Sequence, residues 1–144
     1  MESKLAFFIP EISSHGSDNE FGPGFYTADN LCYALEYVRI GGAIMVFKDP
    51  YLHSTEVWEP DLQSWNAWVA RWKHLPLEIA QQPIPAEYGS ADFIKGAISS
   101  RGQDVQACRG VPTPSENIQL AACSFKGCKA LSESPELIIF VERA

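Results

Sequence analysis

Short apolar runs alternate with polar and proline-containing stretches along this chain, and they predict five β-strands. Each run has the length of a strand and is bounded by turn-forming residues. The runs cover residues 4–9, 43–47, 93–99, 118–123 and 137–141. Because strands dominate the second half of the chain, the pattern predicts an α+β fold in which a sheet carries helices on its outside.

A helical period of apolar residues appears in the first half of the chain. Positions i, i+3, i+4 and i+7 are apolar in one segment, which predicts a helix that buries this face, with Thr27 or Asp29 as its N-cap. The four positions are Leu31, Ala34, Leu35 and Val38.

A tryptophan-rich helix is expected from about residue 61 to 73, and a short one over 126–131. The tryptophan-rich helix is expected to present Leu62, Trp65, Val69 and Trp72 to the sheet on one face, with Trp68 beside it. Residues 11–24 and 100–117, which are rich in polar residues, Gly and Pro, predict loops.

The composition indicates one globular domain spanning residues 1–144. Hydrophobic residues make up 46% of the 144 positions and charged residues 20%. The formal net charge is −7 and no basic cluster offsets it, which argues against binding to nucleic acid or to an anionic membrane surface. No apolar run approaches the ~20 residues that span a bilayer, and the N-terminus does not resemble a signal peptide. We therefore expect a cytoplasmic or otherwise intracellular protein.

The cysteines predict no metal centre. Cys32, Cys108, Cys123 and Cys128 form no Cys-x-x-Cys pair, and the chain has only 3 histidines to join them. The expected state is four reduced thiols, most of them in apolar surroundings.

The segment Phe21-Gly22-Pro23-Gly24-Phe25-Tyr26-Thr27-Ala28-Asp29 stands out from a plain core pattern. Gly24 permits a tight turn or the close approach of a planar ligand. Tyr26 and Tyr37 would then face each other across a gap that suits a flat ring. An ordinary turn followed by surface tyrosines is the alternative interpretation, as is a pocket for a different planar ligand.

The longer stretch FGPGFYTADNLCYALEY resembles the nicotinamide-pocket segment of the ADP-ribosyltransferase fold. This fold occurs in poly-ADP-ribose polymerases and in a related branch of bacterial and fungal domains. The resemblance implies split antiparallel β-sheets with flanking helices, and NAD as substrate without a metal. It implies that Tyr26 forms one wall of the pocket and that Tyr37 stacks on nicotinamide. Ala34 stands where the polymerases have a serine that binds the carboxamide, which weakens that contact.

A second motif, His15-Gly16-Ser17, is similar to the His-Gly-Ser/Thr motif of the same fold. The resemblance implies that His15 binds the adenosine-side ribose and that the Gly16 backbone holds the nicotinamide amide. The distance from Ser17 to Phe21 is shorter than in typical members, so a solvated loop histidine remains the alternative. Weaker similarities extend over residues 42–47, 65–71 and 91–96.

The family places a glutamate near the ribose at the start of a late strand, and two residues compete for that position. Glu116 is followed by Asn117-Ile118 and resembles the polymerase pattern, whereas Gln119 matches the bacterial and fungal branch. An amide cannot stabilise the oxocarbenium-like transition state with negative charge, and losing such an electrostatic contribution costs ~3–4 kcal/mol.

Two functions follow from the resemblance. The first is mono-ADP-ribosyl transfer to a protein or small-molecule acceptor, or hydrolysis of NAD. The alternative is a catalytically inactive module that binds a nucleotide or a protein partner.

Overall fold

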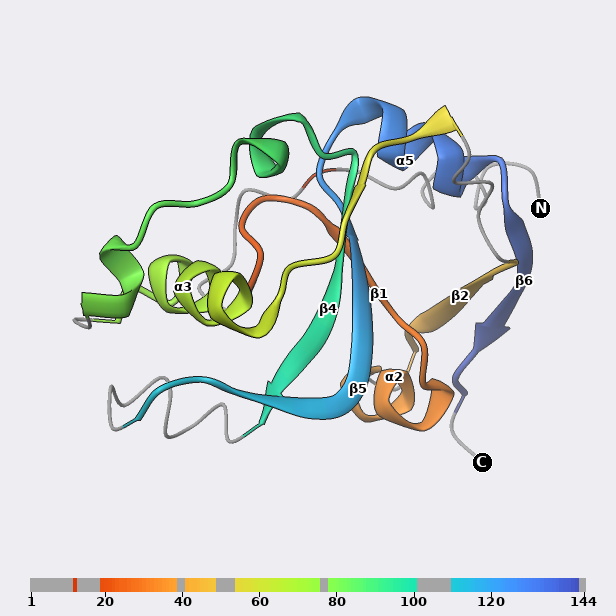
Figure 1. Ribbon diagram of the computed structural model, residues 1–144. Helices are drawn as coiled ribbons and strands as arrows, with labels where there is room; N and C mark the ends of the chain where they lie inside the picture. The colour runs from red at the N-terminus through yellow and green to blue at the C-terminus, as the bar shows by residue number, and fades with distance from the viewer. Residues whose placement is uncertain are drawn as a thin grey trace.

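A computed structural model of the protein describes residues 12, 19–38, 41–48, 54–75, 78–100 and 110–142, and these form a mixed α+β fold (Figure 1). This part of the chain contains two sheets and three α-helices. The helices are α2 (Leu31–Tyr37), α3 (Leu62–Trp72) and α5 (Phe125–Ser132), and two short 3-10 helices are η2 (Glu78–Gln81) and η3 (Ala86–Ser90). None of the helices in these ranges has the length and apolar character needed to cross a bilayer.

The larger sheet has four strands in the order β1-β5-β4-β3. Their bounds are Phe25–Ala28 for β1, Thr113–Ala122 for β5, Phe93–Ser100 for β4 and Val57–Trp58 for β3. Strands β1, β5 and β4 pair antiparallel, but β3 runs parallel to β4. The expectation of antiparallel sheets is therefore wrong for β3. The chain between β3 and β4 passes through α3, and such a crossover brings the next strand back in the same direction.

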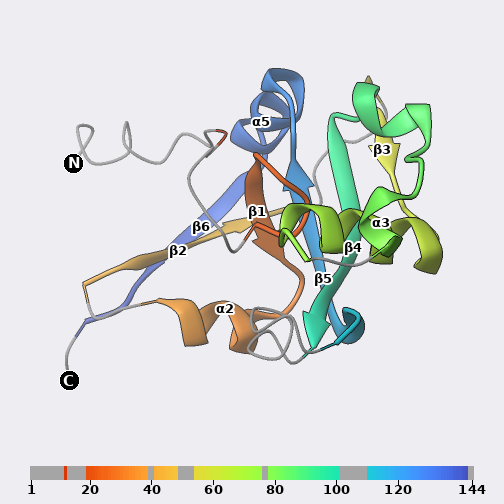
Figure 2. The same ribbon diagram turned by 90° about the vertical axis from the view of Figure 1, so that its left-hand side faces the viewer.

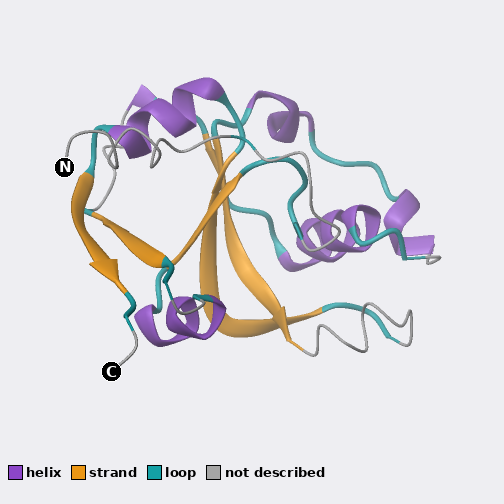
Figure 3. Ribbon diagram, turned by 180° about the vertical axis from the view of Figure 1, so that it is seen from behind, coloured by secondary structure: helices purple, strands orange, loops and turns teal. Residues whose placement is uncertain are grey.

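The smaller sheet pairs β2 (Ala43–Phe47) with β6 (Pro135–Phe140) in antiparallel orientation. It lies beside the larger sheet, on the side away from α3, as the front and rear views show (Figures 1 and 3). Ile44 is its one buried hydrophobic residue among those described. A two-stranded sheet is marginally stable alone, so this ribbon depends on what it packs against.

Two buried clusters cover opposite faces of the four-stranded sheet. Helix α3 lies across one face (Figure 2), where its tryptophans pack on the sheet. Helix α5 packs on the other face. Because successive strand residues point to opposite sides, Ala121 belongs to the α3 cluster and Ala122 to the α5 cluster. The α3 cluster contains Phe21, Trp65, Trp68, Val69, Ala91, Ile94 and Ala121, and the α5 cluster contains Phe93, Ala122, Cys128 and Leu131.

Several predicted elements are confirmed. Strand β2 has the expected bounds, and β4, β6, α3 and α5 each agree with the predicted run to within two residues. On α3, Trp65, Trp68 and Val69 are buried as expected, but Leu62, the first residue of the helix, is 60% exposed. The strand predicted over residues 4–9 lies outside the described residues.

Other predictions are corrected by the structure. Residues 25–28, expected to lead straight into a helix, form β1, and the N-cap of α2 is Asn30 rather than Thr27 or Asp29. The predicted buried face of α2 is wrong, since Leu31 is 49% and Leu35 43% exposed. Strand β5 begins at Thr113, inside the predicted loop. Pairing with β4 explains this extension, because polar residues join a strand when a neighbour satisfies their backbone.

The carboxylate of Asp92 joins β3, β4 and α5. It accepts hydrogen bonds from the Glu56 amide at 3.0 Å and from the Ser124 hydroxyl, and Lys126 lies 3.4 Å away. Ser124 in turn caps α5 by accepting from the Gly127 amide at 3.0 Å. Burial alone would raise the pKa of Asp92, but these hydrogen bonds and the Lys126 charge hold the pKa below its ordinary value. The ionised carboxylate therefore stabilises the fold.

We expect Asp92→Asn to destabilise the protein by about 1–3 kcal/mol at pH 7, because a buried donor replaces one acceptor oxygen. The difference in free energy of unfolding between the wild type and this variant should shrink as the pH falls below the ordinary aspartate pKa of about 3.9, since protonation removes the contribution of the carboxylate. Urea unfolding at pH 7 and pH 3 measures both effects. Glu136→Gln, at an exposed position of β6, is the control. An equal loss at both pH values would contradict the role of the charge.

A substitution at Gly127 tests the packing of α5 on the sheet. A Cβ atom there would collide with the carbonyl oxygen of Asp92, which is held in place by a 2.8 Å hydrogen bond from the Cys123 amide. We expect Gly127→Ala to lower the free energy of unfolding by about 1–3 kcal/mol despite the better helix propensity of alanine. Gly89→Ala, where the added atom meets nothing within 4 Å, should be neutral or stabilising. Chemical denaturation of both variants measures the change in the free energy of unfolding. A change of the same sign in Gly127→Ala and Gly89→Ala would argue against this packing.

Candidate functional site

The turn before β1 is centred on Phe21, whose side chain is completely buried in the α3 cluster. Its backbone groups are paired with aromatic side chains. The Phe21 amide donates to the Tyr26 hydroxyl at 2.9 Å, and its carbonyl accepts from the Trp68 indole at 3.1 Å and from the Tyr88 hydroxyl at 3.3 Å. A buried backbone group costs free energy unless it is paired, so these rings fix the path of the turn.

Gly22 has a positive φ of 88° and lies against the Trp72 indole, which would overlap any added Cβ atom. Both the backbone conformation and the available space therefore require glycine here. Gly24 is buried next to β5, where an added Cβ would come within 3.1 Å of the Ala122 carbonyl oxygen. The glycines of this motif bring the turn close to α3 and to β5.

Tyr26 lies in β1 and packs its ring against the α3 cluster. Its hydroxyl donates to the Gly22 carbonyl at 2.7 Å while it accepts from the Phe21 amide. Burial raises the pKa of Tyr26 well above its ordinary value, although the hydrogen bond from the Phe21 backbone opposes this effect. The phenol therefore stays neutral and closes the turn. This structural role was not foreseen from the sequence.

A buried polar cluster formed by Glu20, Ser99 and Gln119 lies next to this turn, on the same face of the sheet. The carboxylate of Glu20 accepts from the Ser99 amide at 3.0 and 3.1 Å, from the Ser99 hydroxyl, and from Gln119 Nε2 at 2.9 Å. Glu20 is 6% and Gln119 7% exposed. The sequence analysis missed Glu20 because its only signal is a charged residue beside the FGPG turn, and its partners are 79 and 99 positions away.

Glu116 and Gln119, the two candidates for the position near the ribose, differ in their surroundings. Gln119 lies in the regular part of β5, opposite Gly96, whereas Glu116 lies where the register between β4 and β5 shifts, between Ala97 and Ser99. Gln119 shares its face with Ala121 and Tyr26, whereas Glu116 is exposed. Of the two, Gln119 is the one that shares a face with Tyr26.

Helix α2 starts directly after β1 and is attached to β5. The Asn30 side chain accepts from the amides of Cys32 and Tyr33 and donates to Asn117 Oδ1 at 3.0 Å. Figures 1 and 2 show α2 near the end of β1, and none of its described side chains, which leave out that of Tyr37, belongs to the buried clusters. These polar contacts attach the N-terminus of the helix to β5.

The remaining predicted site residues are only partly described. Ala34 is half-buried in the middle of α2. Tyr37 is the last residue of α2, but its side chain lies outside the described part, so the predicted facing of Tyr26 and Tyr37 stays a prediction. His15, Gly16 and Ser17 also lie outside the described residues.

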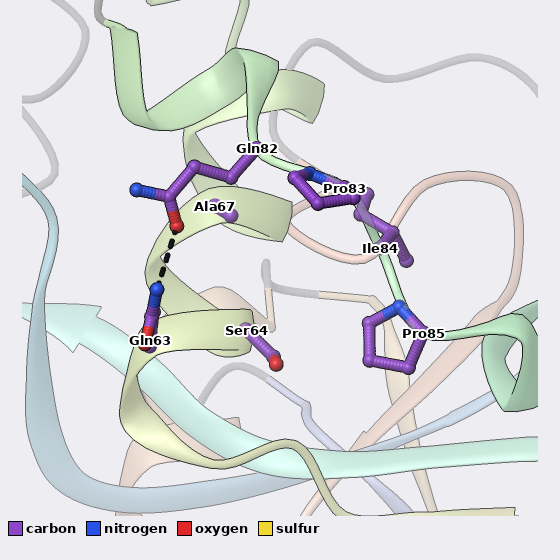
Figure 4. A pocket seen from close by; sticks show the side chains of 7 residues that line it. All are labelled: Gln63, Ser64, Ala67, Gln82, Pro83, Ile84 and Pro85. Carbon is purple, nitrogen blue, oxygen red and sulfur yellow. Dashed lines mark hydrogen bonds between the residues drawn. The ribbon is translucent and has the colours of Figure 1, made fainter.

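A shallow open pocket of about 370 Å³ lies elsewhere, between α3 and the chain that follows η2 (Figure 4). It is lined by Gln63, Ser64 and Ala67 of α3 and by residues 82–85. Gln63 and Gln82 join across it through a 3.0 Å hydrogen bond. No residue expected to bind NAD lines this pocket.

The described cysteines are free thiols, and no three described His, Cys, Asp or Glu residues are placed to hold a metal ion. Cys128 is buried and Cys32 is exposed, while Cys108 lies outside the described residues. Burial raises the pKa of Cys123 to about 12. A thiol with this pKa is protonated at neutral pH and is a poor nucleophile.

No known protein family, curated protein or solved structure gives a significant match to this chain.

We expect Tyr26→Phe to destabilise the protein by about 1–3 kcal/mol, because it leaves the Phe21 amide and the Gly22 carbonyl without their partner. Tyr88→Phe should cost less, since it removes one 3.3 Å hydrogen bond to a carbonyl that keeps its bond from Trp68. Thermal and urea unfolding measure the stability, and hydrogen exchange of the Phe21 amide reports on the turn. Unchanged protection of that amide in Tyr26→Phe would contradict the role of the hydroxyl.

Proposed function

We propose that this protein is an ADP-ribosyltransferase-like module that binds NAD+ and turns it over slowly or not at all. One observation carries the proposal. The β1–β5 register places Gln119 opposite Ala28, the last residue of β1, and the Asn30–Asn117 hydrogen bond ties the start of α2 to β5 two residues before Gln119. The three segments that the resemblance implicates in NAD binding therefore meet where β1 ends against β5.

The predicted lack of turnover rests on the charge of this site. Gln119 is neutral, and the nearby carboxylate of Glu20 already accepts hydrogen bonds from Ser99 and Gln119. A neutral amide in place of a carboxylate removes an electrostatic contribution of about 3–4 kcal/mol to the transition state, or roughly a hundred- to thousandfold in rate. Binding survives such a change better than catalysis, since a ribose hydroxyl can still donate to an amide oxygen.

Mono-ADP-ribosyl transfer or hydrolysis of NAD+ is the second candidate, with a protein or a small molecule as the acceptor. It is favoured by the Glu20 carboxylate, which lies 2.9 Å from Gln119 Nε2 and could supply the missing charge if the cluster opened. The proposal places the protein inside the cell, where NAD+ is available.

Isothermal titration of NAD+ into the purified protein tests binding. We expect measurable affinity that falls at least tenfold in Tyr37→Ala, because stacking of an aromatic ring on a planar base contributes about 1–3 kcal/mol. Leu35→Ala, an exposed position of the same helix, should bind as the wild type does. Absence of binding by the wild-type protein, or equal affinity in Tyr37→Ala, would overturn the proposal.

Release of nicotinamide from NAD+ separates the two candidates. The proposed module should release it no more than about a hundredth as fast as a comparable enzyme with a carboxylate at this position. Release that is well above buffer and is abolished by Glu20→Gln would instead support the transferase or hydrolase.

A further inference from the structure

The contact between Glu20 and Gln119 joins a carboxylate and an amide that are both almost fully buried. Their separation of 2.9 Å is that of a well-formed N–H···O hydrogen bond. Glu20 is anchored independently of Gln119, because the amide and hydroxyl of Ser99 both donate to it. The carboxylate is therefore a fixed acceptor, and Gln119 is oriented by it.

The chemistry of the two groups determines which way the amide points. An ionised carboxylate only accepts hydrogen bonds, so Gln119 must present its Nε2 to Glu20. Its Oε1 is consequently turned away from Glu20, and none of the described residues donates a hydrogen bond to it. This oxygen is therefore an acceptor whose orientation is set by the bond from Nε2 to Glu20.

We propose that Glu20 is the positioning residue of the candidate NAD+ site, and that it holds Gln119 so that Oε1 accepts a hydrogen bond from a ribose hydroxyl. The inference rests on the proposed function for the identity of the ligand. It also explains the amide at position 119, since a carboxylate there would place two negative charges at hydrogen-bond distance inside the protein.

The pair is chemically interchangeable, which makes the inference testable. In Glu20→Gln/Gln119→Glu, the new amide at position 20 can accept from Ser99 through its oxygen and donate to the new carboxylate through its nitrogen. The exchange therefore retains the hydrogen bonds of the cluster and moves the negative charge from the turn to β5. Gln119→Glu alone, in contrast, leaves two carboxylates facing each other, and Glu20→Gln alone leaves two amides.

A double-mutant cycle measured by urea unfolding at pH 7.5 tests the pairing without any ligand. We expect Gln119→Glu to raise the unfolding equilibrium constant by about 10- to 100-fold, and Glu20→Gln to raise it by a smaller factor. The double exchange should return it to within about threefold of the wild type. Glu116→Gln/Gln119→Glu is the control, because Glu116 is exposed, lies outside the buried cluster and should give no rescue. Additive effects in the exchanged pair would overturn the inference.

NAD+ titrations of the same variants test the positioning role. Glu20→Gln should weaken binding about tenfold, since the amide at 119 loses its charged acceptor, and the double exchange should restore affinity and raise the rate of nicotinamide release. Restored stability with affinity still tenfold below the wild type would limit Glu20 to a structural role and overturn the positioning claim. If the wild type binds no NAD+, the proposed function fails, while the unfolding cycle still decides whether the two residues are coupled.

Discussion

The structure depends on the complete burial of Phe21 in a turn whose backbone is held by side chains from distant parts of the chain. The aromatic ring lies between α3 and the sheet, and Tyr26, Trp68 and Tyr88 pair its amide and carbonyl groups. Burying a phenylalanine is favourable by about 1.5–3 kcal/mol, but leaving its backbone groups unpaired would cancel that gain. The aromatic cluster thus supplies both apolar contact area and hydrogen bonds. It sets the direction in which the chain enters β1.

This constraint governs the candidate site. Because the turn is fixed, Glu20 meets Ser99 and Gln119 on the inner face of the sheet. The same turn also engages the hydroxyl of Tyr26, which donates its proton to the Gly22 carbonyl. The FGPGFY segment, read from sequence as the wall of a ligand pocket, also builds the core. The segment proposed to bind a ligand thus includes residues that stabilise the fold.

The half of the site contributed by α2 has a different physical character. The helix has 7 residues, its Leu31 and Leu35 are largely exposed, and its N-terminus is attached through Asn30. A helix this short gains little from its own hydrogen bonds. The Asn30 cap and its bond to Asn117 therefore attach the start of α2 to β5.

Local patterns were sufficient for the elements whose burial follows from their own sequence. The sequence predicted β2, β4, β6 and α3 because each of these segments carries a full apolar face or run. The α+β class follows from the order of these segments. Strand β1 and the first half of β5 were missed, because β1 has only 4 residues and the first half of β5 is polar, so that each becomes a strand through pairing with a neighbour.

The sequence by itself determined the apolar segments, the glycine turn and the presence of an amide at position 119. Tertiary structure alone decided that Gln119 faces Glu20 across 99 positions of chain, that Tyr26 turns its hydroxyl back to the Gly22 carbonyl, and that β3 runs parallel to β4. The physical reason is that hydrophobic periodicity is a property of neighbouring residues. The pairing of buried polar groups instead depends on which distant segments the core brings into contact.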